Sequence, residues 1–331
     1  MPEPAPPARR RIVVTGGGGF IGGQVVRILA GRGDDVIVPV RDSRRAQHLA
    51  SYSATIVDDD LSDVARLTEL LRDANAVIHA AGSYRVGIRK TARGAMWDAN
   101  VGTTTRILDA AEAAGTKRIV YVSTVNVFGN THGRVVDESY RRDPRDGFLS
   151  WYDETKLGAQ EVAEQRASAG APIVFVLPSQ VYGPGDHSGI GEQLRLAHDG
   201  RLRYEALTDV GLGFVHVDDL AAGIVAALDR GAVGEKYVLS GPRTTLGEAI
   251  AIAARLGGHR PPALRVPTGL LRLARPLGGL IGQPNLGEVI SAAAGVTYWA
   301  TADKAVRDLG FAPRGIDEGL ADVFAPGSFD V

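Results

Sequence analysis

Two residues with useful chemistry lie four positions apart in the stretch YDETK, residues 152–156. If this stretch is helical, Tyr152 and Lys156 lie on one face of the helix, one turn apart. A tyrosine is normally a poor acid, with a pKa of about 10, but a nearby ammonium stabilises the phenolate and brings proton transfer closer to neutral pH. The pair is therefore a candidate for general acid–base chemistry, although the same spacing arises by chance on many helices.

A second stretch could bind a charged group. It is TGGGGFIGG, residues 15–23, with six glycines in nine positions. It follows a run that reads as a strand and opens a helical pattern, which is the context of a dinucleotide-binding loop. Glycines permit a tight turn and a close approach of the backbone to a pyrophosphate at the helix N-terminus. Two registers fit the spacing: one starts at Gly16 and the other at Gly17, and both include Gly19 and Gly22.

The residues after the second strand-like run bear on which dinucleotide binds. NAD sites usually place an Asp or Glu at the end of that strand, where it binds the ribose hydroxyls. Here the sequence reads PVRDSRR, with Val40 at the acid position, Arg41 next, and Arg44 and Arg45 close by. A guanidinium can bind a 2′-phosphate bidentately. We therefore expect NADP(H) in preference to NAD(H), with Arg41 at the 2′-phosphate; the alternatives are an NAD site that uses Asp42 and a solvated basic turn.

Alternating strand and helix patterns in the first half of the chain would position these groups. The β-branched runs that read as buried strands are residues 11–15, 35–40, 54–58, 76–81, 118–123 and 172–178. The stretches between them that read as helices include residues 20–32, 62–72, 94–114 and 151–169. This alternation predicts an α/β fold, a Rossmann-type doubly wound parallel sheet of six or seven strands with helices on both faces.

The chain divides into three expected parts. Residues 1–10 are proline-rich and are expected to form a disordered tail, and residues 11–178 are expected to form the dinucleotide-binding Rossmann domain. Beyond them, loops rich in Gly and Pro interrupt the alternation, so residues 179–331 are expected to form most of a smaller C-terminal substrate-binding lobe. Parts of residues 214–241 read as elements that return to the Rossmann domain.

The composition excludes several classes of function. The chain has 331 residues, of which 44% are hydrophobic and 23% charged, and its net charge of −1 offers no field to attract nucleic acid or an anionic membrane. The absence of cysteine excludes disulfides, thiolate nucleophiles and cysteine-based zinc sites, and we predict no metal. No apolar run approaches the roughly 18 residues that span a membrane. We expect a cytoplasmic protein.

Taken together, the motifs resemble the extended branch of the short-chain dehydrogenase/reductase superfamily, also called the NAD-dependent epimerase/dehydratase superfamily. The Tyr152–Lys156 pair and the glycine loop carry the resemblance, which selects the register of Gly16, Gly19 and Gly22. Similar segments extend over residues 11–322, and they are DDDL, VIHAAG, DANVGTTTRILDAAEAAG, YVSTVNVFG, LPSQVYGPGD, FVHVDDLA and DKAVRDLGFAP.

The resemblance implies roles for individual residues. The implied catalytic residues are Thr124, Tyr152, Lys156 and Asn100. The implied cofactor-binding residues are Gly16, Gly19, Phe20, Ile21, Gly22, Arg41, Asp60, Leu61, Ala80, Ala81, Gly82, Ser123, Tyr152, Lys156, Pro178, Gln180 and Val181. The expected substrate pocket includes Tyr84, Arg85, Val125, Asn126 and His187. By contrast, His216, Asp218 and Asp219 read as structural groups at a helix N-terminus.

Departures from the family patterns narrow the reaction. Nucleotide-sugar 4,6-dehydratases carry Asp-Glu directly after their Thr, whereas this chain has Val125 and Asn126, which cannot transfer protons. Nucleotide-sugar epimerases usually place an Arg just before the segment FVHVDD, and DVGLGFVHVDD has none. A diphosphate would then lose charge-assisted hydrogen bonds worth about 1.5–3 kcal/mol each. Substitutes for that arginine would have to come from Arg85, Arg195, Arg201 or Arg203.

The remaining patterns resemble the NADPH-dependent carbonyl reductases of the branch, the dihydroflavonol-reductase-like group, which shares VRD at residues 40–42. A related bacterial group of hopanoid-associated sugar epimerases shares other segments. We expect NADP(H)-dependent, reversible reduction of a ketone or aldehyde, with Tyr152 as general acid and a small molecule as substrate. The alternatives are an NAD(P)-dependent sugar or nucleotide-sugar epimerase and a non-catalytic NADP-binding protein.

The resemblance also implies a homodimer through the helices at 94–114 and 152–169. Their small residues would permit close packing between two copies. The same residues would equally suit helices that only cover the sheet.

Overall fold

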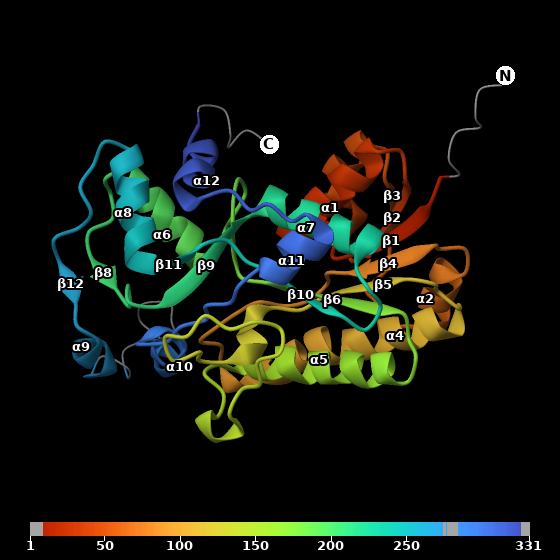
Figure 1. The fold of residues 1–331 in the computed structure, drawn as a ribbon, viewed down its shortest axis with the longest axis horizontal. Coiled ribbons are helices and arrows are strands. Elements are labelled where there is room, and N and C mark those ends of the chain that lie inside the picture. Colours follow the sequence, from red (N-terminus) through yellow and green to blue (C-terminus); the bar gives the residue numbers. More distant parts are fainter. Residues whose placement is uncertain (1–8, 274–275, 277–283, 326–331) are drawn as a thin grey trace.

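The computed structural model describes residues 9–273, 276 and 284–325, so residues 1–8 of the expected tail lie outside the described part. Seven parallel strands form the central sheet in the order β10-β6-β5-β4-β1-β2-β3 (Figure 1). Their bounds are Arg11–Thr15 (β1), Asp35–Val40 (β2), Thr55–Asp58 (β3), Ala76–His79 (β4), Ile119–Val122 (β5), Ile173–Pro178 (β6) and Lys236–Leu239 (β10). This arrangement confirms the predicted Rossmann-type doubly wound sheet.

Helices cover both faces of the sheet (Figure 1). One face carries α1 (Phe20–Gly31), α7 (Val217–Arg230) and α11 (Asp303–Leu309), and the other carries α2 (Val64–Leu71), α4 (Thr103–Ala113) and α5 (Trp151–Ser168). Side chains of successive strand residues point to opposite faces of the sheet. Ile12 and Val14 accordingly belong to one buried cluster and Val13 to the other. The strands are apolar on both faces because both are buried.

The helix expected at residues 94–114 is interrupted. The structure has α3 (Arg93–Trp97), a π-helical segment (Asp98–Gly102) and then α4. A wider turn of this kind bulges the backbone, and such bulges are frequent at functional sites. Here the bulge contains Asn100, whose side chain is tied to two neighbouring segments, and local hydrogen bonding of this kind is invisible to a periodicity argument.

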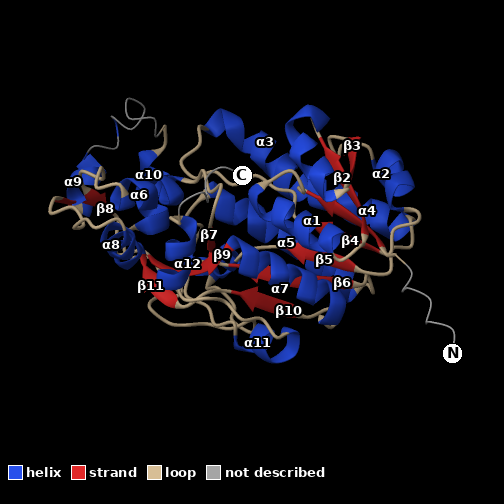
Figure 2. Cartoon of the chain, turned by 90° about the horizontal axis from the view of Figure 1, so that it is seen from above, coloured by secondary structure: helices blue, strands red, loops and turns tan. Residues whose placement is uncertain are grey.

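A second layer of smaller elements lies beyond one end of the sheet (Figure 2). Its three-stranded sheet has the order β11-β9-β7, and β8 pairs with β12 in a separate two-stranded ribbon. These strands are β7 (Gln180–Tyr182), β8 (Glu205–Ala206), β9 (Gly211–His216), β11 (Arg243–Thr245) and β12 (Arg265–Val266). The helices around them are α6 (Gly189–His198), α8 (Leu246–Leu256), α9 (Thr268–Leu273), α10 (Leu286–Ala293) and α12 (Ile316–Val323).

Residues 214–241 divide between the two sheets. The strand β10 pairs with β6 and α7 packs on α1, whereas β9 pairs with β7 and β11 in the smaller sheet. The main sheet and the smaller one therefore share a continuous stretch of chain. Among the described residues, every helix is too short or too polar to cross a bilayer.

Short 3-10 helices follow several strands. They are Ser43–Tyr52, Lys90–Ala92, Val125–Phe128 and Pro144–Asp146. The first comes after β2 and the third after β5, so both begin at the carboxyl edge of the sheet. Parallel α/β sheets bind their ligands at this edge, next to the point where the strand order reverses, which here lies between β1 and β4.

Candidate active site

The glycine loop between β1 and α1 has almost no space for side chains. Gly16 has φ +73°, and a Cβ there would lie 2.7 Å from the backbone nitrogen of Ala81. A Cβ at Gly22 would lie 2.2 Å from the carbonyl oxygen of Gly16. The amide of Gly19 donates to that same oxygen over 2.9 Å. Gly16, Gly19 and Gly22 are thus interlocked, in the register that the resemblance selects.

The start of α1 suits an anion. Gly19 is the N-cap, so no side chain caps the helix, and the first turn, which begins with Phe20, Ile21 and Gly22, contains no acidic residue. The first amides of a helix lack partners within the helix, and the helix dipole favours negative charge at this end. The residues present therefore fit a pyrophosphate group.

Arg41 and Asp42 have different environments. The Arg41 side chain is exposed and makes no ion pair within the described part of the chain. Asp42 accepts a hydrogen bond from the amide of Arg44 over 3.2 Å and pairs with its Nε over 2.9 Å, which makes it the cap of the 3-10 helix that follows. The carboxylate that would favour NAD is therefore engaged locally. The Arg45 side chain lies outside the described residues.

The segment DDDL after β3 adopts an unusual backbone. Leu61 has φ +63°, which a branched side chain seldom adopts. Its amide donates to Asp59 over 2.7 Å and its carbonyl accepts from Arg106 over 2.8 Å. Asp60 is exposed and accepts from the amide of Ser62 over 3.0 Å, and hydrogen bonds with Ser62 hold the Asp60 pKa below its usual range. Hydrogen bonds with Asp59 and Arg106 therefore hold the backbone of Leu61 in this conformation.

Tyr152 and Lys156 lie in the first turns of α5 and are both buried. Lys156 Nζ donates to the carbonyl oxygen of Val122 over 3.0 Å at the end of β5, and burial lowers its pKa to about 8. Burial raises the Tyr152 pKa well above its ordinary value, and a hydrogen bond with Thr124 acts in the opposite direction. The phenol therefore holds its proton at neutral pH, as a general acid requires.

Asn100 uses its whole side chain to join three segments. Its Oδ1 accepts from the amide of Ser83 over 2.7 Å, and its Nδ2 donates to the Ser83 carbonyl over 3.1 Å and to Thr155 Oγ1 over 2.8 Å. Its backbone carbonyl accepts from Thr104 Oγ1 over 2.7 Å. A carbonyl oxygen can accept two hydrogen bonds, so a water held by Asn100 would bind at its backbone or side-chain oxygen, whereas both protons of Nδ2 are already donated.

A buried chain of hydrogen bonds connects the glycine loop with this helix. Thr15 Oγ1 lies 2.8 Å from His79 Nδ1, and His79 Nε2 lies 3.0 Å from Thr104 Oγ1. Because Thr104 gives its proton to the Asn100 carbonyl, His79 donates through Nε2 and accepts from Thr15 through Nδ1. Burial lowers the His79 pKa to about 3, so the ring is neutral. Sequence reasoning missed His79, although it lies within VIHAAG.

A second chain runs from Thr124 to a buried acid. Thr124 Oγ1 donates to Asn126 Oδ1 over 3.1 Å, and Asn126 Nδ2 donates to Asp153 Oδ1 over 2.9 Å. Burial raises the Asp153 pKa to about 6, and its other oxygen has no hydrogen-bond partner among the described residues. Sequence reasoning missed Asp153 because it also reads as an N-terminal helix residue, whose amide donates to the capping Ser150 over 3.1 Å.

The remaining cofactor candidates follow β4, β5 and β6. Ala80, Ala81 and Gly82 come directly after β4, Pro178 ends β6, and Gln180 and Val181 begin β7. Ser123 follows β5, but its side chain is buried and donates to Gln160 Oε1 over 2.5 Å. Its hydroxyl is therefore turned toward α5.

Some of the substrate-pocket candidates lie beside Tyr152 or are buried, and others are exposed. The ring of Tyr84 packs edge-on against that of Tyr152, with centroids 4.7 Å apart, and Val125 is buried. Arg85 and His187 are exposed. Sequence reasoning missed Glu288 of α10. Its carboxylate accepts from the amide of Trp151, the neighbour of Tyr152, over 2.9 Å.

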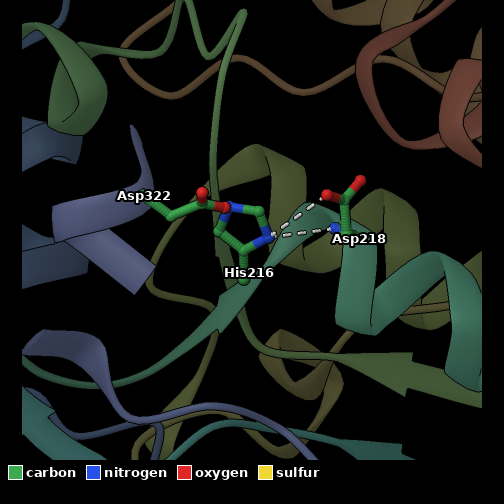
Figure 3. Close-up of side chains that lie close together, drawn as sticks. All are labelled: His216, Asp218 and Asp322. Atoms are coloured by element: carbon green, nitrogen blue, oxygen red, sulfur yellow. Dashed lines mark hydrogen bonds and ion pairs between the residues drawn. The ribbon is translucent and has the colours of Figure 1, made fainter. Parts of the chain in front are cut away.

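A different polar cluster lies where α7 begins. His216 is buried and caps α7, while Asp218 and Asp322 approach its two ring nitrogens from different sides, at 3.9 and 3.7 Å (Figure 3). One ligand atom from each of the three residues lies within 4.8 Å of the others, but both carboxylates already have cationic partners. Arg27 pairs with Asp218 over 3.0 Å, and Arg314 pairs with Asp322 over 2.9 Å. The cluster is an ion-pair network that joins α1, α7 and α12.

Comparisons with known proteins agree with this geometry. A protein of Synechocystis sp., whose name assigns it provisionally to dihydroflavonol 4-reductase, is 31% identical over 92% of this chain and 90% of its own length. The 2-alkyl-3-oxoalkanoate reductase of Stenotrophomonas maltophilia is 29% identical over 91% of this chain and 94% of its own.

Solved structures show the same architecture with a bound dinucleotide. A double mutant of the dTDP-glucose 4,6-dehydratase DesIV from Streptomyces venezuelae, solved with NAD, has a TM-score of 0.77 and 25% identity, covering 97% of this chain and 99% of that one. The model of the NAD-dependent epimerase/dehydratase family matches residues 12–240. The chain therefore belongs to the NAD-dependent epimerase/dehydratase family, the extended branch of the short-chain dehydrogenases/reductases.

Proposed function

We propose that this protein is an NADP(H)-dependent reductase that converts a ketone or aldehyde reversibly to an alcohol. The observation that carries the proposal is the buried, protonated Tyr152 beside Thr124, at the edge of the sheet where the glycine loop also lies. A bound nicotinamide would supply the hydride. Tyr152 gives its proton to the carbonyl oxygen, and Thr124 donates a hydrogen bond to the same oxygen.

The second chain of hydrogen bonds positions Thr124. Its hydroxyl donates to Asn126 Oδ1, and Asn126 itself donates to Asp153. A substrate oxygen would have to compete with Asn126 for the Thr124 proton. Asp153 thus acts through Asn126, as a positioning residue.

Lys156 and Asn100 support the proton donor. A buried ammonium with a pKa of about 8 is well suited to bind ribose hydroxyls while anchored at Val122. The Asn100 carbonyl retains an acceptor site for a water that would return a proton to Tyr152 after each turnover.

The preference for NADP(H) rests on Arg41 and Asp42. Arg41 is exposed and has no competing acid within the described part of the chain, so its guanidinium is available for a 2′-phosphate. Asp42 is committed to Arg44 and would have to give up that pairing to bind a ribose hydroxyl.

An apolar carbonyl compound is the proposed substrate class. Val125 and Tyr84 lie beside the proton donor, and one relative is named for reducing a 2-alkyl-3-oxoalkanoate, a ketone on an alkyl chain. An epimerase remains the second candidate because the family includes such enzymes. The substitutes for its missing arginine are poorly placed, since Arg195 pairs with Glu192 over 2.7 Å and Arg85, Arg201 and Arg203 are exposed.

A homodimer through α4 and α5 is part of the proposal. The half-exposed Trp97 packs against Trp151 at 5.9 Å between ring centroids, and a Cβ at Gly158 would lie 3.2 Å from Trp97. The surface around Trp97 is therefore partly apolar, and Trp97 packs closely against α5. Light scattering at micromolar concentration should give the mass of two chains, and the mass of one chain would refute the dimer.

The experiment that tests the function is a cofactor-oxidation assay. The purified protein is mixed with NADPH or NADH and a panel of alkyl ketones, β-keto acids, aldehydes and nucleotide sugars, and absorbance reports cofactor loss. We expect stoichiometric NADPH oxidation with a member of the ketone or aldehyde set. Interconversion of nucleotide sugars without net cofactor loss would favour the epimerase instead.

A further inference from the structure

One end of the molecule combines exposed apolar side chains with several arginines. It contains the ribbon of β8 and β12 and the helix α9, which lie together at the end of the molecule away from β3 in both views (Figures 1 and 2). Between Glu248 and Glu288 the sequence contains five arginines and no Asp or Glu. The net charge of the whole chain, −1, conceals this local asymmetry.

Four large apolar side chains are exposed here. The exposed fractions are 54% for Tyr204, 62% for Leu264, 58% for Leu270 and 79% for Leu273. Exposed large apolar side chains occur singly on ordinary surfaces, but a group of them marks an interaction surface. Leu273 has the largest exposed fraction among the large apolar residues that the structure describes.

The backbone arranges these residues in pairs. The strands β8 and β12 run parallel with Glu205 opposite Arg265, and the Glu205 amide donates to the Leu264 carbonyl over 2.9 Å. Tyr204 and Leu264 are therefore neighbours on the face opposite to that of the Glu205–Arg265 pair. Leu270 and Leu273 are three residues apart in α9 and share one side of that helix.

Arginines surround the apolar pairs without being neutralised. Arg203, Arg260 and Arg272 are exposed, and no ion pair is formed by any of them among the described residues. The acid nearest in the ribbon, Glu205, is buried and already paired with Arg265 over 3.2 Å. The surface therefore presents leucines and a tyrosine next to unpaired cations.

We propose that this end of the molecule, defined by Tyr204, Leu264, Leu270 and Leu273 with Arg203 and Arg272, docks on an anionic lipid surface. Apolar side chains enter the headgroup boundary while cations bind acidic headgroups, and neither effect alone gives stable binding. Because Glu205 is already paired with Arg265, the unpaired Arg203 and Arg272 favour an anionic surface over an apolar partner of neutral charge. The protein lies on the membrane and does not cross it.

The proposed docking surface has a short connection to the candidate active site. The helix α10, which packs against α9, carries Glu288, whose carboxylate accepts from the Trp151 amide. Asn285 just before α10 donates its amide to the Gly87 carbonyl over 3.1 Å, in the loop that also carries Tyr84. Docking would thus place the substrate side of the site near the lipid surface, but the lipid binding itself does not depend on the proposed reaction.

Co-sedimentation with vesicles tests the proposal on the full chain. Vesicles of phosphatidylcholine with phosphatidylglycerol are compared with vesicles of phosphatidylcholine alone, at low and at high salt. We expect binding to the anionic vesicles that weakens at high salt, and little binding to the neutral ones. Absence of binding to anionic vesicles at low salt would overturn the proposal.

Matched variants locate the surface. Leu270→Ser with Leu273→Ser, and separately Arg203→Gln with Arg272→Gln, should each lower the partition coefficient by roughly tenfold or more. The control is Val306→Ser with Arg307→Gln, which replaces an exposed valine and a neighbouring arginine on α11 and should leave binding unchanged. Circular dichroism checks that each variant folds.

Two outcomes would contradict the assignment. Equal loss of binding in the α11 control would show a general charge effect rather than this surface. If the leucine variants change only the oligomeric mass measured without lipid, the surface binds a second copy of the chain. The cofactor-oxidation assay is independent of both results, so failure of the proposed reaction would leave this test intact.

Discussion

Two polar clusters of this protein are built from similar groups and differ in how their charges are balanced. Around His216, the carboxylates of Asp218 and Asp322 are paired with Arg27 and Arg314, respectively. Around Tyr152, the carboxyl group of Asp153 is buried with one oxygen unpartnered among the described residues, and its hydrogen bonds are to the neutral side chains of Asn126 and Ser150.

The difference fits a structural role for the His216 cluster and supports the chemical role that we propose for the Tyr152 cluster. An ion-pair network in which each carboxylate has a cationic partner can join three helices without taking part in proton transfer. In the Tyr152 cluster, burial moves the pKa of Asp153 up to about 6, although hydrogen bonds with Asn126 and Ser150 and the charge of Arg142 act in the opposite direction. Burial also moves the pKa of Lys156 down to about 8. Shifts caused by burial at the carboxyl edge of a sheet are typical of functional sites.

The largest expected effect comes from removing the proton donor. Tyr152→Phe keeps the ring and its packing against Tyr84 but lacks the hydroxyl, so kcat should fall by at least about 100-fold. Cofactor affinity, followed by fluorescence titration, should survive. The matched control is Tyr140→Phe, whose hydroxyl accepts from Arg134 at an exposed position. Full turnover by Tyr152→Phe would show that the Tyr152 cluster is not the catalytic one.

The next effect concerns the buried carboxyl group of Asp153. In the folded protein the Asp153 pKa is about 6, against 3.8 for the free side chain, so the folded state binds more protons than the unfolded state between these pH values. Stability should therefore fall as pH rises from about 4 to 6. Asp153→Asn removes this loss and should raise the free energy of unfolding at pH 7 by on the order of 2–3 kcal/mol.

Urea unfolding of both proteins from pH 4 to pH 8 measures this difference. The two stability curves should approach each other at the acid end and separate toward neutral pH. A constant difference across the whole range would mean that Asp153 is not protonated in the folded state at pH 5, and would place it with the balanced carboxylates of the His216 cluster.

An unpaired arginine should have a larger functional effect than a paired one. Arg41→Ala should weaken NADPH binding by about 1.5–3 kcal/mol, the value of a charge-assisted contact, and leave NADH binding nearly unchanged. Arg44→Ala, which removes the partner of Asp42, is the comparison. Isothermal titration with both cofactors reads the effect. Equal losses for NADPH and NADH would contradict a role for Arg41 at the 2′-phosphate.

The smallest effect belongs to the balanced cluster. Asp322 is half-exposed and shares Arg314 with the partly buried Asp219, to which Arg314 is also bound over 2.8 Å. Asp322→Asn should therefore lower the free energy of unfolding by no more than about 1 kcal/mol and should not change kcat. A loss of kcat in Asp322→Asn, together with an increase of kcat in the wild-type protein on addition of a divalent cation, would show that the cluster binds a metal.

Much of the fold and part of the site could be predicted from the sequence because the signals are local. The runs at 11–15 and 35–40 are strands with those bounds, and Phe20 begins α1. The glycine loop and Tyr152 were singled out by their spacing, since a tight turn and a single helical face need few residues, and the family resemblance then selected the glycine register and implied the role of Tyr152. Asp153 and His79 were missed because each matters only through a partner far away in the chain, Asn126 and Thr104 respectively.

The sequence by itself determined the parallel sheet, the glycine loop and the position of Tyr152 on a helix, because these depend on periodicity and on backbone conformations open to few residue types. Only the tertiary structure decided how charges are balanced. The burial of Asp153, the capping role of Asp42, and the gathering of leucines and arginines beside β8 and β12 all depend on which distant segments meet. Electrostatic free energy depends on local solvation and neighbours, and neither can be read from the order of residues along the chain.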